Sequence, residues 1–238
     1  MKKITDYIPN TITCVNVAAG TAAVFAAMRQ DELWCGLQGY QWAYIFIAIA
    51  AVADFLDGLS ARLLHAYSET GRELDSLCDL VSFGVAPAVL LYGACNACGV
   101  PAWGAWTAVL IPVFGALRLA RFNVAATTAP SVNFTGLPIP ANAIFWIGFT
   151  AWMYELEIIS GVVVVVCVLL LSWIMTSRMR LFSLKFRSFN LRDNWERYSL
   201  VLACAVCCLT MGVTGLLWTI VYYVCLSAAR QRRLARSK

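Results

Sequence analysis

The chain is built mainly of long apolar runs that are separated by short polar segments. A helix needs about 20 apolar residues to cross the hydrocarbon core of a bilayer. Eight stretches approach that length, at residues 9–29, 40–64, 73–96, 102–124, 139–156, 158–177, 198–212 and 214–229. The last two are short, so six crossings with a re-entrant C-terminal pair are an alternative. The pattern predicts an all-α, polytopic membrane helix bundle with about eight transmembrane helices.

The composition points to the same class of protein. Of the 238 residues, 61% are hydrophobic and 13% are charged, and the mean hydropathy is +0.73. Soluble domains carry about 25% charged residues, so a soluble fold is excluded. The apolar runs are continuous and do not alternate, which argues against a transmembrane β-barrel. Residues 1–7 are too short and polar for a cleaved signal peptide, and they suggest a short N-terminal helix on the membrane surface.

The distribution of basic residues predicts the orientation. With eight spans, all of the 18 Lys and Arg residues except Arg29 fall on one side of the membrane. Because cytoplasmic loops are enriched in Lys and Arg, we expect both termini and the connection at 178–197 to be cytoplasmic. Tryptophans such as Trp42 and Trp152 lie near the opposite ends of their spans, where an interfacial aromatic belt is expected. The basic tail is interpreted as a topology signal, and no nucleic-acid partner is expected.

Four carboxylates interrupt the apolar pattern within a short stretch: Asp54, Asp57, Asp75 and Asp79. A carboxylate at membrane depth is destabilising unless something compensates its charge. The spacings of three and four residues place each pair on one face of a helix. If the two helices turn these faces toward each other, four carboxylates converge on one small volume. Hard divalent cations prefer such oxygen ligands, so the spacing predicts a site for Mg²⁺ or Mn²⁺.

Two other interpretations of the acids are open. A structural ion-pair network with Arg62 and Arg72 is one, although two arginines cannot neutralise four carboxylates. A divalent metal transporter is the other, because acids within a membrane also line ion paths. Transport predicts acids that are spread across the membrane, whereas these acids cluster toward the predicted cytoplasmic side.

The ten cysteines do not indicate a metal site or a disulfide framework. Cys95 and Cys98 form a CxxC pair, but His65 is the only histidine, and structural zinc usually has four Cys or His ligands. The cysteines are spread along apolar segments, where cysteine behaves as a small hydrophobic residue. We therefore expect them to pack within the bundle.

The residues around the acids repeat a known signature. They read Asp54-x-x-Asp57-Gly58-x-x-Ala61-Arg62, then eight residues, then Gly71-x-x-x-Asp75-x-x-x-Asp79. This pattern resembles the signature of the CDP-alcohol phosphatidyltransferases at every defined position. The resemblance implies a six-helix core over about residues 1–180, followed by a C-terminal helix pair and basic tail at 181–238, all in one domain. It also implies metal binding by Asp54, Asp57 and Asp75, with Asp79 as the general base and as a further ligand of the second metal.

Flanking residues resemble the phosphatidylserine synthase branch of this family. They are Pro9-Asn10-x-x-Thr13-x-x-Asn16, Ser82 to Ala88, Arg118-x-x-Arg121-x-Asn123 and Gly136 to Ala141. The resemblance implies transfer from CDP-diacylglycerol to L-serine with release of CMP, two Mg²⁺ or Mn²⁺ ions, and a homodimer in a prokaryotic cytoplasmic membrane. Glycerol-3-phosphate, inositol phosphate and choline are alternative acceptors, and an archaeal ether lipid is an alternative to diacylglycerol.

Small residues beside the acids leave room for a ligand. Gly58, Ala61 and Gly71 have little or no side chain, and the resemblance assigns the space beside them to the nucleotide, with Arg62 next to it. Close packing between helices is the structural alternative.

Three polar residues near the end of the fourth span are candidate substrate contacts. Arg118 and Arg121 are three residues apart and share a helix face, and Arg binds phosphate or carboxylate through paired hydrogen bonds. They are candidates for the lipid phosphate or the serine carboxylate, and Asn123 could add a polar contact. Anchoring of the helix on the cytoplasmic side is the alternative.

Polar residues at the start of the first span form a further candidate group. Asn10, Thr13 and Asn16 fall on nearly one helix face, where they could contact the nucleotide or form interhelical hydrogen bonds. Ser82 lies about one turn past Asp79 and could face the acceptor.

Overall fold

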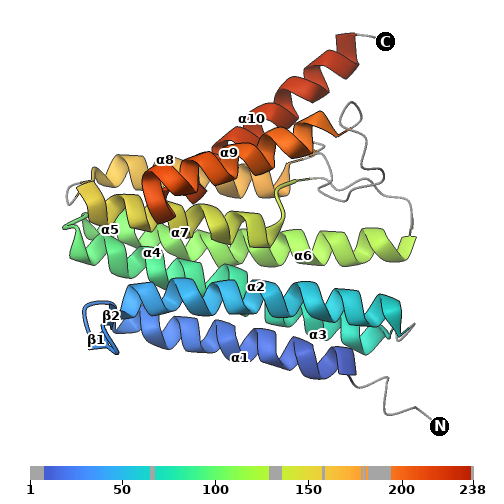
Figure 1. Cartoon of the computed structure of the whole chain (residues 1–238), viewed down its shortest axis with the longest axis horizontal. Helices are drawn as coiled ribbons and strands as arrows, with labels where there is room; N and C mark the ends of the chain where they lie inside the picture. The colour runs from blue at the N-terminus through green and yellow to red at the C-terminus, as the bar shows by residue number, and fades with distance from the viewer. Residues whose placement is uncertain are drawn as a thin grey trace.

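A computed structural model describes residues 8–64, 68–128, 136–156, 159–177, 179, 181 and 194–236 (Figure 1). The described residues are helical apart from loops and one antiparallel hairpin of two short strands, β1 (Leu33–Trp34) and β2 (Leu37–Gln38). The predicted all-α bundle is therefore confirmed. The expected surface helix at residues 1–7 and the residue His65 lie outside the described part of the chain.

The helices run back and forth along one long axis (Figure 1). They are α1 (Ile8–Met28), α2 (Gly39–Leu63), α3 (Glu69–Leu80), α4 (Ala86–Ala97), α5 (Ala102–Ala105), α6 (Leu110–Thr128), α7 (Ile139–Leu156), α8 (Gly161–Thr176), α9 (Trp195–Met211) and α10 (Gly215–Arg236). A π-helical turn, η2 (Val81–Val85), joins α3 to α4, and the 3₁₀ turns η3 (Trp106–Val109) and η4 (Gly212–Thr214) follow α5 and α9. Each of the eight predicted spans overlaps one or more of the described helices.

The lengths of the apolar helices agree with an integral membrane protein. Among the described residues, five helical stretches are long and apolar enough to cross a membrane: Ile8–Met28, Gly39–Leu63, Glu69–Ala97, Ala102–Ala125 and Trp195–Arg233. The last of these contains the reversal at η4, and Gly161–Thr176 is apolar but shorter. The count of eight crossings therefore stays a prediction.

Several of the described arginines lie toward one end of the bundle. The start of α1, the end of α2 and the start of α3 lie together at the right of Figure 1, and α10 also ends toward the right, at the top of the view. These elements carry Arg62, Arg72 and Arg230. Arg29 follows α1 at the opposite end, beside the β-hairpin. Among the described residues, these three arginines therefore lie toward the end opposite Arg29, and the orientation of the bundle in a membrane stays a prediction.

Small side chains let α1 approach its neighbours closely. The buried residues of α1 and α2 are mostly alanine or glycine and recur at helical spacing: Ala19, Gly20, Ala23, Ala26 and Ala27 in α1, and Ala43, Ala50 and Ala53 in α2. Such stripes allow helix backbones to pack at short range in membranes. A Cβ atom on Gly20 would lie only 2.7 Å from the Cα atom of Ser82. The start of η2 is therefore held directly against α1.

The C-terminal pair packs on the core through α7. Gly212 has a φ of +59°, which is a conformation that favours glycine, and the chain reverses there between α9 and α10. A Cβ atom on Gly148 would lie 3.0 Å from the Cα atom of Leu217, so α10 rests closely on α7. Thr214 adds a hydrogen bond of 2.7 Å to the Glu155 carboxylate at the end of α7.

Candidate functional site

Helices α2 and α3 bring three of the predicted aspartates together. Asp54 and Asp57 lie in the second half of α2 and Asp75 lies in α3, and one carboxylate oxygen from each is within 4.8 Å of the others. Asp75 Oδ1 is buried and has no hydrogen-bond partner among the described residues. Carboxylates this close repel one another unless a cation offsets their charge. The oxygen donors and the unpartnered buried oxygen fit a divalent cation.

Helix α3 begins at a serine N-cap. Ser68 precedes the helix in an extended conformation, and its hydroxyl accepts a hydrogen bond of 2.9 Å from the Gly71 main-chain N–H. This N-cap lets the helix begin at Glu69, four residues before the start of the predicted span at 73. Serine at the N-cap and an acid in the first turn both favour the start of a helix. The sequence therefore contained a signal for a helix that begins at Glu69.

Asp79 lies one helical turn beyond Asp75 on the same face of α3. It is buried, and its Oδ1 accepts a hydrogen bond of 3.2 Å from Asn16 Nδ2 on α1. Asn16 is completely buried, and its main-chain carbonyl accepts a hydrogen bond of 3.0 Å from the Ser82 hydroxyl. Asn16 and Ser82 therefore join α1 to the region around Asp79, and both side chains are enclosed.

Thr13 on α1 contacts another of the four aspartates, Asp57. Its hydroxyl donates to Asp57 Oδ2 at 2.7 Å, and both residues are buried. The hydrogen bond fixes one oxygen of Asp57 from the side of α1. Of the two roles considered for Thr13, the structure shows the interhelical hydrogen bond.

A cavity of about 570 Å³ lies beside the acids, between α1, α2, α3 and α6. Eight of the predicted site residues line it: Asn10, Thr13, Asp57, Gly58, Ala61, Arg62, Gly71 and Asp75. A Cβ atom on Gly58 would meet no atom within 4 Å, so this position faces open space. A Cβ atom on Gly71 would lie 2.9 Å from Asn10 Oδ1, which shows that Gly71 allows α1 and α3 to approach each other.

The cavity wall also contains Arg72 and Phe122, which the sequence pattern did not identify as substrate-binding residues. Phe122 lies on α6 one turn after Arg118, whose guanidinium carbon is 5.9 Å from the centre of its ring. The spacing of four residues between an arginine and an aromatic residue was a signal that could have suggested this pair.

The three polar candidates on α6 have different surroundings. Arg118 is half-buried, and its Nε atom is buried with no hydrogen-bond partner among the described residues. Arg121 is exposed and donates to the Thr176 carbonyl at 3.2 Å. Asn123 donates to Ser76 Oγ at 3.0 Å and to a Glu73 carboxylate oxygen at 3.3 Å, so it links α6 to α3. Arg118 is thus the candidate that retains a buried donor for a ligand.

Comparison with protein families gives one match over most of the chain. Residues 6–178 match the family model described as CDP-alcohol phosphatidyltransferase. The matched region includes α1 to α8 and all of the predicted site residues, and it ends before α9.

Several individual proteins are similar to this chain. A CDP-diacylglycerol–serine O-phosphatidyltransferase of Mycobacterium leprae is 40% identical over 150 residues, which are 60% of this chain and 46% of that protein. One of Bacillus subtilis is 38% identical over 135 residues, 57% of this chain and 70% of that protein. An archaetidylserine synthase of Methanothermobacter thermautotrophicus is 34% identical over 179 residues, 72% of this chain and 70% of that protein. The chain thus spans about half the length of the mycobacterial relative.

Proposed function

Because this chain belongs to the CDP-alcohol phosphatidyltransferase family, we propose that it transfers a phosphatidyl group from CDP-diacylglycerol to the hydroxyl of L-serine. The products are phosphatidylserine and CMP. The observation that carries the proposal is the group of three carboxylates from α2 and α3 beside a cavity of about 570 Å³. The names of the bacterial relatives support serine as the acceptor.

The acidic residues would hold two divalent ions, Mg²⁺ or Mn²⁺. Asp54, Asp57 and Asp75 offer oxygens within 4.8 Å of one another, and Asp79 would complete the set from the next turn of α3. When bound, such ions neutralise phosphate oxygens and stabilise the charge that develops on the leaving group. The chain supplies the rest of the chemistry through its own side chains.

The transfer exchanges one phosphorus–oxygen bond for another. The serine oxygen forms a bond to the phosphorus that carries the diacylglycerol, and the bond from that phosphorus to the CMP oxygen breaks. The serine hydroxyl proton passes to Asp79, which acts as the general base. The hydrogen bond from Asn16 holds this carboxylate in one orientation for the step.

The cavity residues would bind the nucleotide and the two charged groups of the substrates. Gly58 and Ala61 leave space for cytidine, with Asn10 and Arg62 as polar contacts in the same wall. Arg118 has a buried donor with no hydrogen-bond partner in the described part of the chain, and a guanidinium donor of this kind suits the lipid phosphate or the serine carboxylate. Arg121 and Asn123 would act less directly, because each bonds another helix or chain segment.

The proposed setting is the cytoplasmic face of a prokaryotic membrane. The basic residues at the aspartate end of the bundle support a cytoplasmic site with both termini on that side. A soluble acceptor and CMP can exchange with the cytosol there, while the lipid chains stay in the bilayer. We propose a single domain over residues 1–238, with a family core at 1–180, and a homodimer as the assembled form.

Purified protein assayed with CDP-diacylglycerol and each labelled alcohol tests the proposal. CMP release is expected with L-serine and not with glycerol-3-phosphate, inositol phosphate or choline. Robust release with another acceptor, and none with serine, would reject the serine assignment. Because one relative is an archaetidylserine synthase, the same assay with the ether-linked CDP-lipid decides between the two lipid classes.

A second measurement separates catalysis from metal transport. In proteoliposomes, an Asp79→Asn variant should lose CMP release while remaining folded. Metal flux that persists in this variant, together with no CMP release from the wild-type protein, would instead support a transporter.

A further inference from the structure

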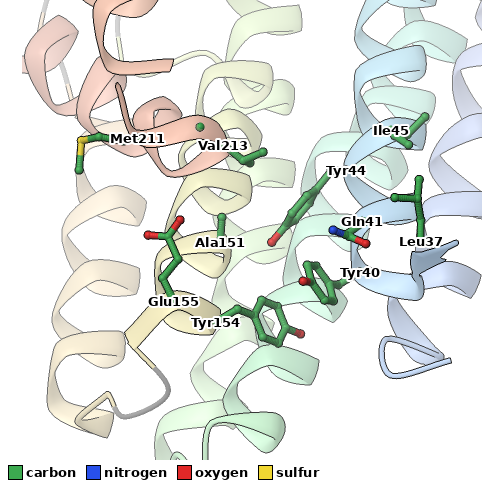
Figure 2. Close-up of a pocket in the computed structure, with 11 residues that line it drawn as sticks. Leu37, Tyr40, Gln41, Tyr44, Ile45, Ala151, Tyr154, Glu155, Met211 and Val213 are labelled. Atoms are coloured by element: carbon green, nitrogen blue, oxygen red, sulfur yellow. The ribbon is translucent and has the colours of Figure 1, made fainter. Parts of the chain in front are cut away.

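A second cavity lies far from the aspartates, between α2, α7 and the turn that joins α9 to α10. Its volume is about 450 Å³. Figure 2 shows side chains from all three regions around the same space. Tyr44 precedes Asp54 by ten residues on α2, which corresponds to about 15 Å along the helix axis. The cavity is therefore separate from the proposed catalytic site.

Three tyrosine rings form one wall of this cavity (Figure 2). The rings of Tyr40 and Tyr154 are stacked with their centres 4.1 Å apart, and those of Tyr40 and Tyr44 meet edge to face at 5.6 Å. Two hydroxyls are tied to the core: Tyr44 shares a 3.0 Å hydrogen bond with Thr150, and Tyr154 donates to Gln30 at 2.9 Å. These bonds hold the aromatic wall in place.

The cavity wall also carries the Gln41 amide and one carboxylate. Glu155 lies across from the tyrosines in Figure 2, and it is the charged residue among the described lining residues. Its carboxylate accepts one hydrogen bond, of 2.7 Å, from Thr214 in η4. A carboxylate beside aromatic rings attracts cations, because the face of a ring carries partial negative charge.

The C-terminal helix pair completes this cavity. Met211, Gly212 and Val213 close the side that faces α2 and α7. These residues lie outside the part of the chain that matches the family model, residues 6–178. The proposed transfer reaction therefore leaves both the cavity and the position of this turn unexplained.

We propose that this cavity binds an alkylammonium group. The tyrosine rings and Glu155 would contact the cation, and Leu37, Ile45, Met211 and Val213 would contact its alkyl substituents. The adjoining Trp42 donates to the Trp34 carbonyl at 2.9 Å, and tryptophans of this kind mark the membrane–water interface. The ammonium group could belong to a lipid headgroup at that interface or to a soluble organic cation.

The first experiment uses tetramethylammonium as a probe, because it has no hydroxyl and cannot act as an acceptor in the transfer reaction. Radiolabelled tetramethylammonium is equilibrated by dialysis with the purified full-length protein. We expect saturable binding that is at least about tenfold weaker in Glu155→Gln and in Tyr40→Leu. The Gln side chain can still accept from Thr214, so Glu155→Gln removes charge with little change in shape.

Matched variants control for folding and for binding elsewhere. Tyr40→Phe keeps the ring and should bind as the wild type does. Asp75→Asn alters the acidic group at the other end of α2 and should leave tetramethylammonium binding unchanged. The proposal is overturned if the wild-type protein binds neither tetramethylammonium nor the phosphatidylethanolamine of the second experiment. It is also overturned if Glu155→Gln and Tyr40→Leu bind tetramethylammonium as well as the wild type does, or if binding depends on Asp75 instead.

The second experiment distinguishes the two sources of the ammonium group. The protein is placed in phosphatidylglycerol nanodiscs with and without phosphatidylethanolamine, and retained lipid is measured by native mass spectrometry. Retention of phosphatidylethanolamine that is lost in Glu155→Gln supports a lipid headgroup. Tetramethylammonium binding without such retention supports a soluble cation. Neither result depends on CMP release. The alkylammonium site can therefore be confirmed when the proposed transfer reaction is rejected, and it can be rejected when the transfer reaction is confirmed.

Discussion

Asn16 on α1 donates a hydrogen bond of 3.2 Å to Asp79 on α3, and both residues are buried. The two residues are 63 positions apart in the chain. The contact depends on the close approach of α1 to η2, where Gly20 faces Ser82. The small-residue stripe of α1 thus determines the position of the carboxylate that is proposed to accept the serine proton.

Replacement of Asn16 by alanine should therefore lower kcat more than it changes KM. A lost hydrogen bond to a charged group is worth about 1.5–3 kcal/mol, which corresponds to roughly ten- to a hundredfold in rate. Asn16 does not line the 570 Å³ cavity, so KM for CDP-diacylglycerol should stay close to the wild-type value. Steady-state CMP release measures both constants.

Thr21→Val is the control for this prediction. Thr21 is also on α1, and its hydroxyl donates to the Val17 carbonyl, without contact to Asp79. If the Thr21 variant loses as much activity as Asn16→Ala, the effect is a general weakening of α1 and the positioning role is wrong.

Two glycines should respond in opposite ways to the same substitution. A Cβ at Gly20 would lie 2.7 Å from Ser82 Cα, and a main-chain atom cannot move aside easily. Gly20→Ala should destabilise the protein by about 1–3 kcal/mol, as overpacking does. Gly58→Ala meets no atom within 4 Å, so its thermal unfolding should be unchanged or slightly raised, since alanine favours a helix.

The activity of the Gly58 variant completes this comparison. The added methyl group projects toward the cavity, so KM for CDP-diacylglycerol should rise while the protein stays folded. Thermal unfolding in detergent and CMP-release kinetics on the same samples check both statements. Equal unfolding temperatures for the two variants would contradict the packing argument.

The helix positions were largely predictable because the lengths of apolar runs determine them. The first two spans, expected at 9–29 and 40–64, are observed as Ile8–Met28 and Gly39–Leu63. The start of α3 was missed, because hydropathy does not register a serine cap such as Ser68. Continuous apolar runs also gave no indication of the π-helical turn at Val81–Val85.

The candidate site was predictable where its residues share a helix, and less so where they come from different helices. The spacing of Asp54 and Asp57 predicted one face of α2, and the structure places both with Asp75. The partner of Asp79 could not be read from spacing, since Asn16 lies on another helix and contact between them depends on how the helices pack. The cavity in Figure 2 was missed for the same reason, because each tyrosine by itself resembles an interfacial aromatic residue.

Removal of divalent metal should destabilise the wild-type protein more than an Asp75→Asn variant. Without a cation, three carboxylates within 4.8 Å repel one another, by on the order of 1–4 kcal/mol for a pair near 4 Å. Asn at position 75 removes one of these charges. In a chelator, Asp75→Asn should therefore unfold at a higher temperature than the wild type, and Mn²⁺ should stabilise it less.

Asp31→Asn is the control for the metal prediction. Asp31 is an exposed acid at the other end of the bundle, near the β-hairpin. Its replacement should leave the response of the unfolding temperature to Mn²⁺ unchanged. A stabilising effect of Mn²⁺ that survives in Asp75→Asn at full size would mean that the ion binds elsewhere.

Arg118 and Arg121 should differ in their importance for substrate binding, although the sequence placed them on one helix face. Arg118 has a buried Nε without a hydrogen-bond partner among the described residues, whereas Arg121 is exposed and bonds the Thr176 carbonyl. Lysine retains the charge but cannot reproduce the paired hydrogen bonds of a guanidinium. Arg118→Lys should lower kcat/KM by about ten- to a hundredfold, on the order of 1.4–2.8 kcal/mol, and Arg121→Lys should change it by less than about threefold. Steady-state CMP release is measured while the concentration of serine or of CDP-diacylglycerol is varied. The KM of the Arg118→Lys variant should rise only for the substrate that Arg118 binds. A larger loss in Arg121→Lys than in Arg118→Lys would contradict the assignment and would make Arg121 the anion-binding residue.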